Sequence, residues 1–139
     1  MRFMGIDPGS KRVGLALGDD ESGFASPHKT LQRQDDASLL RDLIDEAVAQ
    51  GVGSVVLGLP LRMSGLEGPE AKRARALGKA LEQRGNLQVI LWDERFTTVS
   101  AERQLRDSGL RGAKKKDLID QAAATVLLQS YLDARRAQA

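Results

Sequence analysis

Near its amino-terminal end the chain reads Phe3-Met4-Gly5-Ile6-Asp7-Pro8-Gly9-Ser10-Lys11-Arg12. A short apolar run leads to one carboxylate, Asp7, and then to a Pro-Gly pair that predicts a sharp turn. Residues 12–18 are largely apolar again, which predicts an antiparallel partner for a first strand at about 2–7. An acid at a strand end, followed by Gly, Ser and Lys, suits a metal ion or a phosphate. A plain hairpin turn is the alternative interpretation.

The composition is that of an ordinary globular domain. The 139 residues are 41% hydrophobic and 29% charged, with a formal net charge of +2, and we expect one domain over residues 1–139. No apolar run approaches the roughly 18 residues of a membrane span, and no signal peptide is apparent. The chain has no cysteine, which excludes disulfides, thiolate zinc sites and a Cys nucleophile. These features predict a cytoplasmic protein that does not bind membranes.

The hydrophobic pattern predicts an α/β domain. A weak third strand is expected at about 23–31, and continuous apolar runs predict buried parallel strands at 54–60 and 87–92. Helices are expected at about 35–51, 69–84, 98–108 and 117–135. The first of these should bury Leu43, Ala47 and Val48. This order gives a mixed five-stranded sheet with helices on both faces.

The last predicted helix carries a carboxylate on its apolar side. At about 100° per residue, Asp120 shares a face with Ala123, Ala124 and Leu127. A carboxylate there is costly unless it is paired or binds a metal. The alternative is that Asp120 lies in the first turn of the helix, where the helix dipole favours an acid.

A third acid follows the predicted strand at 87–92, and it is either Asp93 or Glu94. Ligands of open α/β sheets collect outside the carboxyl ends of parallel strands, so this acid and Asp7 should lie near each other. Three carboxylates without His or Cys form an all-oxygen site suited to Mg²⁺ or Mn²⁺. Two such ions about 4 Å apart would suit phosphodiester hydrolysis. We expect Asp7, Glu94 and Asp120 to hold them.

Basic residues recur beside these segments, in a pattern that favours a polyanionic ligand. We expect Ser10, Lys11, Arg12 and Arg95 to bind phosphates. A basic loop at 110–116 would hold the flanking backbone through Lys114, Lys115 and Lys116, and Arg62 adds a further cation near the site. Such contacts position a nucleic acid but carry no base specificity.

Several segments together resemble the YqgF/RuvX family of Holliday junction resolvases, which are also described as pre-16S rRNA nucleases. The matching segments are 5–14, Val56-Leu57-Gly58-Leu59-Pro60 with 63–68, Asp93-Glu94-Arg95-Phe96-Thr97-Thr98, and Lys115-Lys116-Asp117 through Ala124. They occur in the family's order and span almost the whole chain. Phe96 replaces a usual Leu and Ser64 a common Asp, and neither is a proposed metal ligand.

The resemblance implies an RNase H-like fold with a nuclease site that depends on Mg²⁺ or Mn²⁺. It places the family's three acids on Asp7, Glu94 and Asp120, in agreement with the trio inferred from the residues. The implied substrate is a four-way DNA junction or a precursor rRNA. A homodimer is expected, since two symmetric cuts across a junction need two sites.

Two other classes of function stay open at this point. A strand that ends in Asp-x-Gly-Ser also resembles the phosphate loop of actin-like ATPases and sugar kinases, although those need two lobes to enclose a nucleotide. A non-catalytic nucleic-acid-binding module that keeps the acids as a relic is the other alternative.

Overall fold

The computed structural model describes residues 1–95 and 112–138. Its five-stranded sheet has the order β3-β2-β1-β4-β5. The strands are β1 (Arg2–Pro8), β2 (Arg12–Asp19), β3 (Ala25–Gln32), β4 (Ser54–Leu59) and β5 (Gln88–Asp93). β1 pairs antiparallel with β2 and parallel with β4, so the predicted mixed sheet is confirmed.

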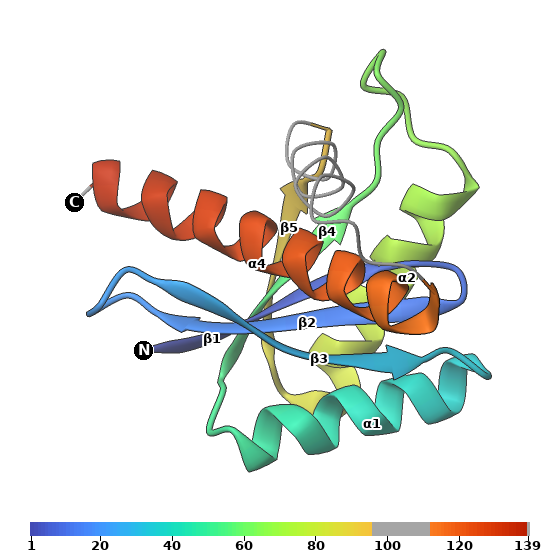
Figure 1. Ribbon diagram of the computed structural model, residues 1–139, viewed down its shortest axis with the longest axis horizontal. Helices are drawn as coiled ribbons and strands as arrows, with labels where there is room; N and C mark the ends of the chain where they lie inside the picture. The colour runs from blue at the N-terminus through green and yellow to red at the C-terminus, as the bar shows by residue number, and fades with distance from the viewer. Residues whose placement is uncertain (96–111, 139) are drawn as a thin grey trace.

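Three described helices cover the two faces of the sheet. They are α1 (Asp36–Ala49), α2 (Pro69–Gly85) and α4 (Gly112–Ala137). In Figure 1, α4 crosses the sheet on one side, and α1 lies on the other side. The helix expected at 98–108 lies outside the described residues. None of the described helices is long and apolar enough to cross a membrane.

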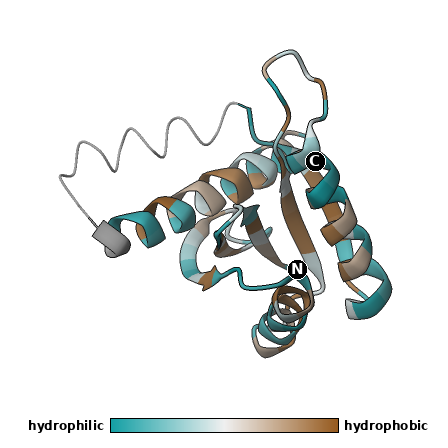
Figure 2. Ribbon diagram, turned by 90° about the vertical axis from the view of Figure 1, so that its right-hand side faces the viewer, coloured by the Kyte–Doolittle hydropathy of each residue, from teal (hydrophilic) through white to brown (hydrophobic). Residues whose placement is uncertain are grey.

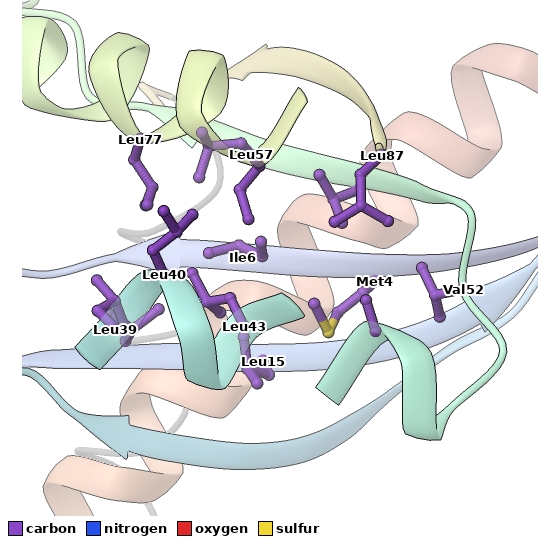
Figure 3. Packing of buried hydrophobic residues seen from close by; sticks show 14 residues of the cluster. Met4, Ile6, Leu15, Leu39, Leu40, Leu43, Val52, Leu57, Leu77 and Leu87 are labelled. Carbon is purple, nitrogen blue, oxygen red and sulfur yellow. The ribbon is translucent and has the colours of Figure 1, made fainter. Parts of the chain in front are cut away.

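The larger hydrophobic core lies between the sheet and the pair α1 and α2. In Figure 3, Ile6 and Leu57 of the sheet point toward Leu40 and Leu43 of α1 and Leu77 of α2. The sequence places these helical residues at i, i+3 and i+4 spacings, which is the period of one helix face. Figure 2 shows mainly hydrophobic central strands beside helices that carry residues of both kinds.

The second core lies between the other face of the sheet and α4. Phe3, Ala16 and Val56 contact Leu127 and Leu128 there. Glycines bring the helix close to the strands: a Cβ on Gly5 would lie 2.9 Å from the carbonyl oxygen of Ala124, and one on Gly14 would overlap the backbone of Asp120. This close approach sets the position of α4 over β1 and β2.

Two local predictions are wrong. Val48 was expected on the buried side of α1 but is 76% exposed, because the buried face ends at Ala47. The basic loop expected at 110–116 is helical from Gly112 onward, so Lys115 and Lys116 belong to α4. The earlier start also removes Asp120 from the first turn, so the helix dipole does not explain that acid.

Candidate active site

Asp7 and Glu94 meet at the carboxyl ends of two parallel strands. Asp7 is the penultimate residue of β1, and Glu94 directly follows β5. The two carboxyl groups are joined by a hydrogen bond across β4, the strand between them. Two acids from positions far apart in the chain are therefore in contact, as the sequence predicted.

A glycine in β4 makes this contact possible. Ile6 pairs with Leu57, so Gly58 is the β4 residue beside Asp7. A Cβ at Gly58 would overlap the carboxylate of Glu94. The side chain of Glu94 thus lies across the strand where a larger residue would exclude it.

Side-chain alternation along β5 separates Glu94 from Asp93. Ile90 and Trp92 pack on the α4 side of the sheet, whereas Val89 and Leu91 pack on the opposite side. Asp93 instead accepts hydrogen bonds from the backbone and the guanidinium of Arg95, the latter from Nε at 2.8 Å. Asp93 is therefore engaged in its own ion pair, and Glu94 is the acid that contacts Asp7.

The third acid, Asp120, lies over β2, near enough for the charge of Asp7 to act on it. Its backbone lies against Gly14, which is the residue paired with Asp7 in the sheet. Its Oδ2 accepts a 2.7 Å hydrogen bond from Nε of Arg12, and its side chain is only 15% exposed. Asp120 is thus close to the Asp7 strand but held by an arginine.

Two carboxyl groups of the site, those of Glu94 and Asp120, have raised pKa values. Burial, followed by the hydrogen bond to Asp7 and the charges of Asp7 and Asp93, raises the pKa of Glu94 to about 10. Burial is also the main reason why the pKa of Asp120 is raised, although Arg12 acts in the opposite direction. Glu94 therefore holds a proton near neutral pH when no cation is present.

A divalent cation fits the Asp7–Glu94 pair by its donor chemistry. Two carboxylates in contact repel each other once both are ionised, and a hard cation with oxygen ligands relieves that repulsion. Within residues 1–95 and 112–138, however, no group of three acidic, His or Cys side chains stands in metal-binding geometry. The expected trio is thus two acids in contact and a third, Asp120, turned to Arg12.

The paired acids open into a cavity of about 260 Å³ at the carboxyl edge of the sheet. Asp7, Ser10 and Glu94 line it, together with Arg33 and Arg73. Arg33 is a site residue that sequence reasoning missed. It donates a 3.0 Å hydrogen bond to the carbonyl oxygen of Gly9, and no local motif indicates that contact.

The residues expected to bind phosphates fall into two groups. Ser10, Lys11, Arg62 and Lys116 are exposed, and Lys115 is half-buried. Arg12 and Arg95 are instead paired with Asp120 and Asp93. The side chain of Lys114 lies outside the described residues.

Comparison with known proteins identifies the family. A family model described as RuvX, Holliday junction resolvase, matches residues 1–134. The chain belongs to the RuvX family. The resemblance found in the sequence is confirmed, and with it the expectation of a nuclease rather than an ATP-binding phosphotransferase.

Relatives of this RuvX-family chain carry a second description. A protein of Chloroflexus aggregans is 41% identical over 134 residues, which cover 96% of this chain and 94% of the relative. One of Pelotomaculum thermopropionicum is 42% identical over 136 residues, which cover 97% and 88%. Both are named as pre-16S rRNA nucleases.

Solved structures share the fold at low sequence identity. RuvC of T. thermophilus in complex with a Holliday junction substrate has a TM-score of 0.64 at 14% identity, covering 100% of this chain and 98% of that one. Fowlpox virus resolvase with Holliday junction DNA has a TM-score of 0.61 at 17% identity, covering 97% and 99%. The RNase H-like fold class is thereby confirmed.

Proposed function

We propose that this protein is a divalent-metal-dependent endonuclease that hydrolyses phosphodiester bonds in structured nucleic acid. The observation that carries this proposal is the hydrogen-bonded pair of Asp7 and Glu94 beside a cavity edged by cations. A carboxylate pair of this kind suits a hard cation, and nearby arginines suit the phosphates of a substrate.

Each residue of the site has a separate role in this proposal. Glu94 would give up its proton, and Asp7 and Glu94 would then hold Mg²⁺ or Mn²⁺, with Asp120 as the third acid of the site. Two bound ions would supply an activated water and stabilise the leaving oxygen. Ser10 and Lys11, which are exposed beside Asp7, would contact the phosphate that flanks the scissile bond. These contacts position the strand without reading its bases.

Two substrates are compatible with this site. The family description favours a four-way DNA junction, and the names of the relatives favour the 5′ end of precursor 16S rRNA. Both substrates contain double-helical arms, and the phosphates of either helix attract basic side chains. A homodimer would suit the symmetric junction, and a cytoplasmic location would suit either substrate.

The experiment is a cleavage assay on a synthetic four-way junction and on a precursor-rRNA end, each with Mg²⁺, Mn²⁺ or chelator. We expect metal-dependent cleavage of at least one substrate and its loss in Asp7→Asn and Glu94→Gln. Retained binding in these variants would separate lost chemistry from lost folding. Binding without cleavage by the wild type under every metal condition would support the non-catalytic module instead.

A further inference from the structure

A second cavity lies between α1 and α2 and shares lining residues with the active-site cavity. Its volume is about 420 Å³, and its floor includes Leu40, Ala76 and Ala80. Arg33 and Arg73 line both cavities, so a groove runs from the paired acids along α2. The catalytic proposal uses only the first of these cavities.

The part of the groove between α1 and α2 is lined mainly by cations. They are Arg33, Arg73, Lys79 and Arg84, with Asp36 as the acid there, whereas Glu70 and the paired acids line the part at the active site. Arg33 and Asp36 form an ion pair at 3.2 Å, so the charges of these two residues offset each other. The net charge that faces the groove therefore belongs to α2.

Three cations of α2 are not neutralised by an acid among the described residues. Arg75, on the same helix, and Arg12 and Arg95 outside it each pair with a carboxylate. Within the described part of the chain, Arg73, Lys79 and Arg84 have neither an ion pair nor a hydrogen bond from their side chains. All three are exposed. Such a row of unneutralised cations attracts a polyanion.

We propose that this groove holds the phosphate backbone of a double-helical arm of the nucleic acid, as that arm leaves the active site. This inference rests on the proposed function for its substrate class. A phosphate chain matches the cations, and its sugars match the apolar floor. The residues that line the groove in the described structure include no aromatic ring, so bases of a single strand have nothing to stack on.

The length of the row suits several nucleotides. At 1.5 Å per residue, Arg73 and Arg84 lie about 16 Å apart along the axis of α2. Phosphates of one strand recur about every 3.4 Å along a duplex axis, so a segment of roughly five nucleotides has the same length as the row of cations. Contacts with phosphates alone give affinity that depends on salt and not on sequence.

The test compares two double variants that each remove two positive charges. Lys79→Gln with Arg84→Gln alters the groove. Lys72→Gln with Arg136→Gln is the matched control, because both residues are exposed and neither lines the groove. Binding to a four-way DNA junction and to a precursor-rRNA helix is measured in chelator, where no cleavage occurs, over a range of salt concentrations.

We expect the groove variant to bind at least about tenfold more weakly, and the slope of log affinity against log salt to fall by nearly one for each cation removed. The control should change less than twofold. Loss on DNA alone or on RNA alone identifies which helix occupies the groove. Equal binding by the groove variant and the control would overturn the proposal.

A second copy of the chain is the competing occupant of the groove. If the groove variant lost self-association in sedimentation experiments but kept its affinity for nucleic acid, the groove would be a protein interface and the proposal would fail. The readout is binding, so it is independent of the nuclease proposal. A groove effect without cleavage by the wild type would refute only the catalytic function.

Discussion

Arg12 and Asp120 are joined by a 2.7 Å hydrogen bond from Nε to Oδ2, although 108 positions separate them in the chain. The bond links the first residue of β2 to the N-terminal third of α4. It also joins a residue that the sequence suggested for phosphate binding to one suggested for metal binding. We therefore expect the arginine to act on the reaction by positioning this acid.

We expect Arg12→Gln to move the acid limb of the pH–activity profile to higher pH. Burial raises the pKa of Asp120 and Arg12 lowers it, so removal of the arginine leaves burial unopposed. Activity should fall most on the acid side of the profile, because more of Asp120 is then protonated. The measurement is kcat and KM across pH.

Arg12→Lys should restore part of the profile, and Arg136→Gln, at the far end of α4, should leave it unchanged. An increase in KM alone, with the pH profile unaltered, would mean that Arg12 contacts phosphate directly.

Gly58→Ala is predicted to displace Glu94 without unfolding the protein. The new Cβ would overlap the carboxylate, and the flexible glutamate side chain would move away from Asp7. Because a misplacement of about 1 Å can cost a factor of about 100 in rate, we expect kcat to fall by about 100-fold. Calorimetry with Mn²⁺ should show weaker metal binding.

Gly53→Ala is the matched control, since nothing lies within 4 Å of a Cβ at that position. It should retain wild-type kcat and metal affinity. If Gly58→Ala bound Mn²⁺ and cleaved substrate as well as this control, the position of Glu94 over β4 would not matter for the chemistry.

Glu94→Gln should stabilise the metal-free protein at alkaline pH. The pKa of Glu94 is raised from 4.5 to about 10, so the folded state holds a proton that the unfolded state loses between these values. The contribution of this proton is present in full below pH 4.5 and is lost as the pH rises toward 10. A glutamine at this position cannot ionise, so the variant does not lose stability in this way as the pH rises.

The measurement is the free energy of unfolding by urea, in chelator, from pH 5 to pH 9. The difference between variant and wild type should grow with pH, by up to about 1.4 kcal/mol for each pH unit. Saturating Mn²⁺ should stabilise the wild type and narrow the difference. Parallel pH curves in chelator would mean that Glu94 does not hold this proton in the folded state.

Gly14→Ala should destabilise the fold rather than alter the chemistry first. A Cβ there would overlap the backbone of Asp120, so α4 would have to move away from the sheet. Overpacking of this kind costs about 1–3 kcal/mol. Thermal unfolding measures this loss of stability, with Gly53→Ala as the reference. If Gly14→Ala were as stable as the reference, α4 would be able to move away from the sheet without loss of stability.

Much of the fold followed from local patterns. The apolar runs at 54–60 and 87–92 gave β4 and β5, and the helical spacing of Ala71, Leu77 and Leu81 gave the buried face of α2. These predictions succeeded because the periods of strand and helix are properties of neighbouring residues. The start of α4 was misplaced, since lysines are good helix formers and no cap residue marks the boundary.

The active site was predictable only in part. Asp7 could be located because a single acid ends the first apolar run, whereas Asp93 and Glu94 were left as alternatives. Alternation along β5 separates them, because Glu94 has the same parity as Ile90 and Trp92. This signal was present in the sequence but required knowledge of which face meets α4.

Residue types and their spacing were sufficient for the strands and most of the helices, because these depend on interactions within a few residues. Three-dimensional packing was needed for the bond between Arg12 and Asp120, the passage of Glu94 over Gly58, and the raised pKa of Glu94. Each of these depends on burial and on atoms from distant segments, and neither quantity is a function of local sequence.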